Sequence, residues 1–196
     1  MNKTQKNMAD IFDKSGSDKQ YNHNYSVGYA DFFEKRSVKT LLEIGIANHT
    51  ISQTSLTAWG EIFPDAEIYG IDIDQSKMMN SDRIKTFVVD QSSKAQLTEW
   101  SNTINKKFDV IIDDGSHIFS HAKLTFELLF GLLSDDGIYI IEDIAKDMTN
   151  WGFDYEQSLD EWKQYLETCT GIKYKIIDCR PDLVDDSIMI EITRDA

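Results

Sequence analysis

The sequence predicts an α/β protein with a doubly wound, mostly parallel seven-stranded sheet. Short apolar runs alternate with amphipathic segments over 196 residues, which is typical of parallel strands joined by helical crossovers. Acidic residues directly follow two of the most apolar runs, at 113–114 and 142–143. Finally, only about eight residues separate the last two strand-like runs. Because this is too short for a helical crossover, the chain should finish in an antiparallel hairpin.

The individual elements follow from hydrophobic periodicity. Apolar and β-branched runs predict strands at 40–46, 67–74, 85–90, 108–113, 138–142, 173–178 and 187–192. Apolar residues at helical spacing predict helices at 27–35, 55–63, 94–104, 122–133 and 154–168. We expect the strand order 3-2-1-4-5-7-6 with the last strand antiparallel. The length favours one domain over residues 1–196, in which residues 1–38 form an N-terminal cap segment and a helix.

The composition limits the classes of molecule that the protein is expected to bind. The net charge is −14, which argues against non-specific binding to nucleic acid and against binding to anionic membranes. Neither a transmembrane run nor a signal peptide is expected from the sequence. Cys169 and Cys179 form no disulfide framework or metal motif, so a reducing, cytoplasmic setting is the expectation. Such a protein suits a small or neutral substrate.

The ends of the first three strands predict a cofactor pocket. Gly45 follows the first strand, where the backbone must turn closely past a ligand, but the other glycines of a dinucleotide fingerprint are absent. Asp72 can accept hydrogen bonds from ribose hydroxyls. Asp90 and Gln91 can bind an adenine edge, although Asp90 could instead cap the next helix. An adenosine without a diphosphate fits this pattern, and S-adenosylmethionine is such a molecule.

The ends of the fourth and fifth strands predict an acidic centre. Asp114 should face Glu142 and Asp143 across neighbouring loops, and three close carboxylates repel one another unless a cation joins them. Mg²⁺ is a suitable hard cation. His117 can take a proton from a substrate hydroxyl. Asp113 should point toward the cofactor or into hydrogen bonds that support the site.

Several of these segments together resemble the metal-dependent sugar O-methyltransferases of macrolide and related natural-product pathways, which are class I S-adenosylmethionine-dependent methyltransferases with a Rossmann-like fold. The matching segments are 16–19 with His23 and Tyr25, 42–46, 68–73, 90–92, 111–117 and 137–143.

The resemblance implies an S-adenosylmethionine-dependent O-methyltransferase acting on a hydroxyl of a sugar or glycosylated small molecule. It implies Mg²⁺ ligands at Asp114, Glu142 and Asp143, and His117 as general base beside Asp114. The cofactor-binding residues that it implies are Glu43, Gly45, Asp72, Asp90, Gln91, Asp113 and Tyr25, with the N-terminal segment folded over the cofactor.

Some features leave alternatives open. The stretch 47–54 lacks the glycines usual after the first strand, so cofactor contacts there, including one from His49, stay unassigned. An aromatic lid over the acceptor is one interpretation of 145–155, and loop packing is the other. The acceptor could be a catechol or a phosphorylated metabolite, and a non-catalytic S-adenosylmethionine-binding protein is the alternative outside catalysis. Whether the chain forms a homo-oligomer is left open.

Overall fold

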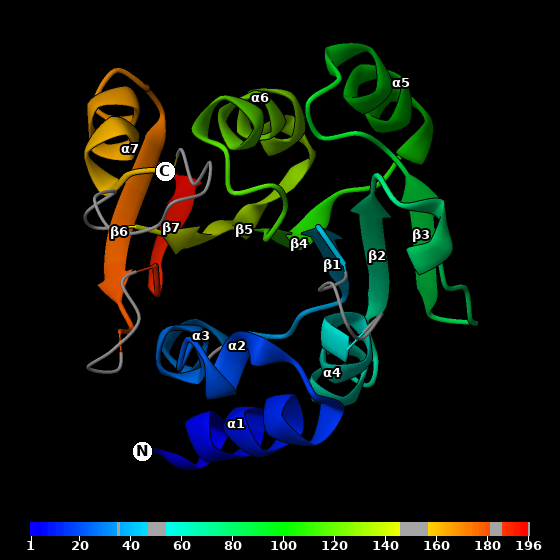
Figure 1. Cartoon of the computed structure of the whole chain (residues 1–196), viewed down its shortest axis with the longest axis vertical. Coiled ribbons are helices and arrows are strands. Elements are labelled where there is room, and N and C mark those ends of the chain that lie inside the picture. Colours follow the sequence, from blue (N-terminus) through cyan, green and yellow to red (C-terminus); the bar gives the residue numbers. More distant parts are fainter. Residues whose placement is uncertain (35, 47–53, 146–156, 181–185, 196) are drawn as a thin grey trace.

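The computed structural model describes residues 1–34, 36–46, 54–145, 157–180 and 186–195. Its centre is a seven-stranded sheet in the order β3-β2-β1-β4-β5-β7-β6 (Figure 1). The strands are β1 Thr40–Ile44, β2 Glu67–Asp72, β3 Ile84–Val88, β4 Phe108–Asp113, β5 Leu133–Ile144, β6 Ile172–Asp178 and β7 Ile188–Arg194. Strand β7 is antiparallel to both β5 and β6, whereas β1 to β5 pair in parallel. The predicted sheet order and terminal hairpin are confirmed.

Helices cover both faces of this sheet (Figure 1). One layer holds α1 Lys3–Ser15, α2 Asp18–Tyr21, α3 Ser26–Phe33 and α4 Thr54–Ile62, and the other holds α5 Lys94–Ile104, α6 Phe119–Leu129 and α7 Leu159–Leu166. Two short 3₁₀ helices, η1 Gln75–Lys77 and η2 Phe130–Leu132, complete the described elements. Each layer buries its own apolar cluster against the sheet. Within the described ranges, we find no helix with the length and apolarity needed to cross a bilayer.

The register brings the carboxyl ends of the central strands level with one another. Ile44 at the end of β1 pairs with Asp113 at the end of β4, and Asp113 pairs with Ile141 near the end of β5. Residues that directly follow these strands therefore meet at one edge of the sheet, which is where ligands bind in open α/β folds.

The N-terminal segment differs from the prediction, because it contains the helix α1. Met8, Ile11 and Phe12 form a narrow buried stripe on an otherwise polar helix, and the Phe12 ring packs edge-on against Trp59 with ring centres 5.1 Å apart. The Asn2 side chain caps the helix start, and Gly16 ends the helix in the left-handed conformation with φ 78°. The sequence did not predict this helix because its few apolar residues are separated by many polar ones.

Strand and helix boundaries also shift elsewhere, and α6 spans Phe119–Leu129 where the helix was predicted at 122–133. Strand β5 begins at Leu133, five residues before the predicted start. The prediction missed this part of the strand because Asp135 and Asp136, which are exposed, interrupt its apolar pattern. The helix predicted at 154–168 is observed as α7, and residues 154–156 lie outside the described part of the chain.

Candidate active site

A cavity of about 270 Å³ opens at the carboxyl ends of β1 to β4. Four of the predicted cofactor residues line it, Gly45, Asp72, Asp90 and Gln91. The other lining residues are Ile44, Ile71, Ile73, Val89, Ser92, Asp114, Gly115, Ser116 and His121. Apolar side chains thus form part of a pocket that also carries amides, hydroxyls and carboxylates, a combination typical of small-molecule sites.

Gly45 determines how closely two loops approach at this edge. Its φ is +77°, and a Cβ atom there would lie 2.0 Å from the carbonyl oxygen of Asp114. The Asp114 amide donates to the Ile44 carbonyl at 2.9 Å. Only glycine suits this close approach of the loops after β1 and β4.

Asp72 and Asp90 are oriented by backbone amides next to the cavity. Asp72 Oδ2 accepts from the Ile46 amide at 3.0 Å and Oδ1 from the Asp74 amide at 2.8 Å. Asp90 Oδ1 accepts from the amide and the hydroxyl of Ser92 at 2.8 and 2.7 Å. Both carboxylates are therefore held in place without a ligand.

Gln91 and Asp113 form a buried pair between the third and fourth strand ends. Gln91 Nε2 donates to Asp113 Oδ1 at 2.6 Å, and Gln91 Oε1 accepts from the Ser116 amide at 2.9 Å. Burial raises the pKa of Asp113 to about 7, although its hydrogen bond from Gln91 opposes the shift. Asp113 thus supports Gln91 and does not itself line the cavity.

Asp114, His117 and Asp143 converge beside this cavity. One ligand atom from each lies within 4.8 Å of the other two. His117 Nε2 is 3.5 Å from Asp143 Oδ2 and 4.0 Å from Asp114 Oδ1. His117 and Asp143 have φ values of 54° and 55°, a left-handed conformation that is uncommon outside glycine and is often found at functional sites. Burial raises the pKa of Asp143, against the opposing effects of His117 and His23.

Glu142 points to a different partner, Lys19. Glu142 and Asp143 are neighbours at an irregularity in the pairing of β5 with β7, and their side chains reach different partners. Glu142 is fully buried and accepts from both the Lys19 ammonium and the Tyr29 hydroxyl. Among the described residues, the group suited to a metal comprises Asp114, His117 and Asp143 and leaves Glu142 out.

Lys19 was not assigned a role by the sequence, although it belongs to the segment 16–19 that carries the resemblance. Its Nζ lies 2.7 Å from Asp114 Oδ2 and 3.2 Å from Glu43 Oε1, and it also contacts Glu142. Burial alone would lower the pKa of Lys19, but the carboxylates around it more than offset this effect and hold its pKa well above the usual value.

Glu43 and Tyr25, assigned to the cofactor by resemblance, lie behind the acidic centre and do not line the cavity. Glu43 accepts from Ser55 Oγ at 2.7 Å and from Trp59 Nε1 at 3.2 Å. The Tyr25 hydroxyl donates to Asp143 Oδ1 and accepts from the Asp143 amide at 2.9 Å. Both side chains thus hold residues of the centre in place.

His121 is a further residue at the cavity. It lines the cavity, and its Nδ1 is 3.0 Å from Ser116 Oγ. His49 and residues 146–155 of the suggested lid lie outside the described residues.

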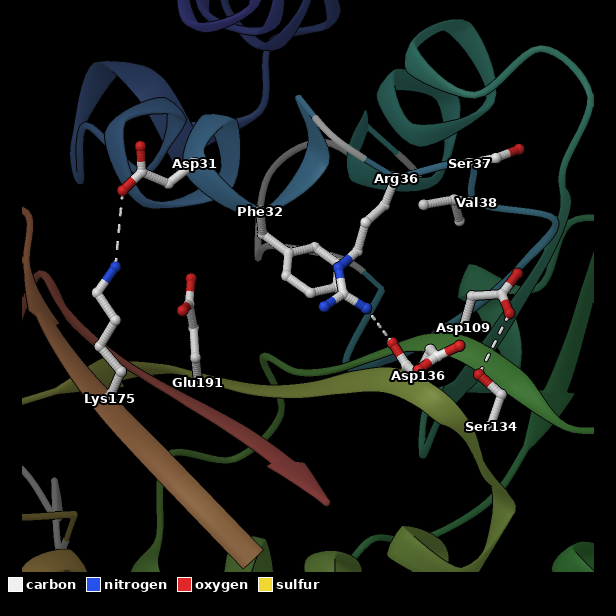
Figure 2. Close-up of a pocket in the computed structure, with 10 residues that line it drawn as sticks. All are labelled: Asp31, Phe32, Arg36, Ser37, Val38, Asp109, Ser134, Asp136, Lys175 and Glu191. Carbon is white, nitrogen blue, oxygen red and sulfur yellow. Dashed lines mark hydrogen bonds and ion pairs between the residues drawn. The ribbon is translucent and has the colours of Figure 1, made fainter. Parts of the chain in front are cut away.

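A larger cavity of about 760 Å³ lies near the amino ends of β1, β4 and β5 and extends beneath α3 (Figure 2). Arg36 stacks on the Phe32 ring at 4.5 Å, and Lys175 pairs with Asp31 at 3.6 Å. Glu191 points into the same space from β7. Ligands of open α/β sheets bind at the opposite edge, so we place the candidate active site at the smaller cavity.

The residues at the carboxyl edge fit both groups that the prediction requires. The cavity combines apolar side chains with the carboxylates of Asp72 and Asp90 and the amide of Gln91, a lining that suits an adenosine. The oxygens of Asp114 and Asp143 with the imidazole of His117 are donors that divalent cations accept.

The sheet order and the layers of helices define the fold as that of class I S-adenosylmethionine-dependent methyltransferases. The solved structure of the MycE methyltransferase from the mycinamycin biosynthetic pathway, in complex with Mg, SAH and mycinamycin VI, superposes with a TM-score of 0.72. It is 23% identical, and the match covers 95% of this chain and 54% of that one.

Sequence comparison relates the chain to sugar O-methyltransferases of antibiotic pathways. It is 34% identical over 143 residues to the 8-demethyl-8-α-L-rhamnosyl tetracenomycin-C 2′-O-methyltransferase of Streptomyces olivaceus, covering 70% of this chain and 37% of the relative. It is 38% identical over 107 residues to the demethylmacrocin O-methyltransferase of Streptomyces fradiae, covering 53% and 27%. The matched part of the chain therefore covers only about a third of the length of these curated relatives. No family model matches it.

Proposed function

We propose that the chain is an S-adenosylmethionine-dependent O-methyltransferase that methylates a hydroxyl of a sugar on a small molecule. The observation that carries this proposal is the convergence of Asp114, His117 and Asp143 beside the cavity at Gly45. The names of the curated relatives support the reaction and the class of acceptor.

In this proposal the 270 Å³ cavity receives the adenosyl part of the cofactor. Asp72 accepts hydrogen bonds from the ribose hydroxyls, and Asp90 and Gln91 bind the adenine edge. The hydrogen bonds that already orient these three side chains reduce the entropy lost on binding. Asp113 and Tyr25 contribute indirectly by holding Gln91 and Asp143.

Asp114 and Asp143 would hold a divalent cation, which we expect to be Mg²⁺. When bound, such an ion polarises the acceptor hydroxyl and lowers its pKa. His117 stands within 4.0 Å of both carboxylates and takes the proton from the acceptor oxygen. The fixed positions of these side chains keep the acceptor oxygen, the methyl group and the sulfonium sulfur in line.

Two further expectations belong to this proposal. We infer that the chain acts as one methyltransferase domain, since its seven strands form one sheet. We also infer a cytoplasmic setting, which the free thiols of Cys169 and Cys179 support.

Calorimetric titration with S-adenosylmethionine, with and without Mg²⁺, tests the cofactor and the metal separately. Methyl transfer to a panel of nucleotide sugars and glycosides, followed by mass spectrometry, then tests the acceptor. Absence of cofactor binding would refute the proposal. Turnover that is unaffected by EDTA would refute the role of the metal alone.

His117→Ala should lower kcat by a factor of about 10²–10⁴, the usual contribution of a general base, while cofactor affinity stays within about twofold. Steady-state kinetics and calorimetry measure the two effects. His121→Ala is the matched comparison, because His121 lines the cofactor cavity. This variant should raise the KM for S-adenosylmethionine more than it lowers kcat. A large loss of cofactor affinity in His117→Ala would instead place His117 in cofactor binding.

A further inference from the structure

Lys19 connects the N-terminal helices to the acidic centre through ion pairs. Its side chain is 1% exposed and makes ion pairs with Glu43, Asp114 and Glu142. These three carboxylates come from the ends of three neighbouring strands, whereas Lys19 comes from α2. A buried lysine with three carboxylate partners is unusual, because buried charges are normally paired one to one or bound to a metal.

Lys19 divides the acidic centre into two halves that share Asp114. Asp114 Oδ2 lies 2.7 Å from the ammonium, while Oδ1 faces His117 at 4.0 Å. Glu43 and Glu142 are both fully buried on the ammonium side. The half that faces away from the ammonium comprises Asp114 Oδ1 and Asp143, with His117 beside them.

Lys19 and Tyr29 both restrain Glu142. The Tyr29 hydroxyl donates to Glu142 Oε1, and the Lys19 ammonium donates to Oε2. Each oxygen of Glu142 therefore has one donor, and an ion bound at Glu142 would lie close to the Lys19 ammonium and be repelled by it. Glu142 as a metal ligand, expected from its place at the strand end and from the family resemblance, therefore stays a prediction.

We propose that Lys19 is a positioning residue for the metal site: its ammonium competes with the divalent ion for Glu142 and one oxygen of Asp114 and so weakens cation binding. This inference rests on the proposed function, which requires a cation at Asp114 and Asp143. Removing the ammonium leaves the surrounding carboxylates without a counter-charge. A divalent ion should then bind more tightly, and stability should depend on that ion.

Lys19→Met tests the proposal because methionine has a similar length and no charge. Titration of the variant with MgCl₂ in a calorimeter should show an affinity for Mg²⁺ about tenfold or more above that of the wild-type chain, as expected when a nearby positive charge is removed from a partly buried site. Thermal unfolding should show a larger rise in Tm on adding MgCl₂ to the variant than to the wild type. Lys14→Met is the matched control, since Lys14 pairs with Glu61 at the exposed surface, and it should bind Mg²⁺ as the wild type does.

Folding of the variant is itself informative. If Lys19→Met folds in MgCl₂ and unfolds in EDTA, the proposal is supported, because the divalent ion then balances the carboxylates in place of the Lys19 ammonium. If it folds in neither, the double variant Lys19→Met/Glu43→Gln removes one carboxylate together with the ammonium, and it should also bind Mg²⁺ more tightly than the wild type.

Two different failures can be told apart. Equal or weaker Mg²⁺ affinity in the folded variants, with measurable binding to the wild type, overturns the role of Lys19 alone. Absence of Mg²⁺ binding in every variant and in the wild type overturns the metal in the proposed function and, with it, this inference.

Discussion

At the scale of single residues, the candidate site depends on side chains whose partners are distant in the sequence. Gln91 is held by Asp113, 22 residues away. Tyr25 holds Asp143 from a distance of 118 residues. Neither Asp113 nor Tyr25 lines the cavity, so substitutions there should act through the residues that they hold.

Gly45→Ala should lower the free energy of unfolding by about 2 kcal/mol or more. The left-handed conformation alone costs an alanine about 1–2 kcal/mol, and its Cβ would lie 2.0 Å from the Asp114 carbonyl oxygen. Urea denaturation measures the loss. Gly131→Ala is the control, because a Cβ atom at Gly131 meets nothing within 4 Å and should change stability by no more than about 0.5 kcal/mol. Equal midpoints for the two variants would contradict the reasoning.

The sequence could locate the ends of the strands but not the directions of the side chains that follow them. Gly45, Asp72 and Asp90 reach one cavity because parallel strands end at a common edge. The orientation of Glu142 depends on Lys19 and Tyr29, which lie more than a hundred residues earlier. Pairing across such separations leaves no local pattern in the sequence.

At the scale of elements, hydrophobic periodicity and capping residues determine where a helix begins and ends. Helix α5 matches the predicted range 94–104, and the Ser93 side chain caps it. Helix α1 was missed because its buried stripe is narrow, and it carries no acidic residue in its first turn. Short apolar stripes are weak signals unless the tertiary partner, here Trp59, is known.

Ser158→Ala should destabilise the protein by about 1 kcal/mol, the usual effect of losing an N-cap. Ser158 and Glu161 form a capping box at the start of α7, and α7 places Trp162 against Phe119 with ring centres 5.0 Å apart. Chemical denaturation checks the value. Ser101→Ala within α5 serves as the control, since the exposed Ser101 hydroxyl donates only to a carbonyl of its own helix. A loss for Ser158→Ala no greater than for Ser101→Ala would show that the cap is unimportant.

At the scale of the whole molecule, stability should depend on pH through buried carboxyl groups. The chain carries a net charge of −14, and ionised carboxylates repel one another in the compact state. Glu191 faces the large cavity in Figure 2. Burial raises the pKa of Glu191, although Lys175 opposes the shift.

Glu191→Gln should flatten the decline in stability with pH. A carboxyl group with a raised pKa keeps its proton longer in the folded state, so the unfolded state releases its proton first as the pH rises. The free energy of unfolding therefore falls from about pH 4, the unfolded pKa of glutamate, until the pH passes the raised folded value. Glutamine does not titrate, so the variant should gain stability relative to the wild type over this range. Urea denaturation across a pH series at constant ionic strength measures the difference, and parallel curves would contradict the prediction.

The way Lys19 and His23 join the site has a consequence for the newly made chain on the ribosome. Lys19 binds Asp114, 95 residues later, and His23 contacts Ser187, 164 residues later. At a synthesis rate of about 5–20 residues per second, the N-terminal helices wait roughly 10–30 s for their last partner to emerge. The ammonium of Lys19 stays hydrated until Glu142 emerges, 123 residues after it. The acidic centre should therefore be among the last parts of the nascent protein to assemble.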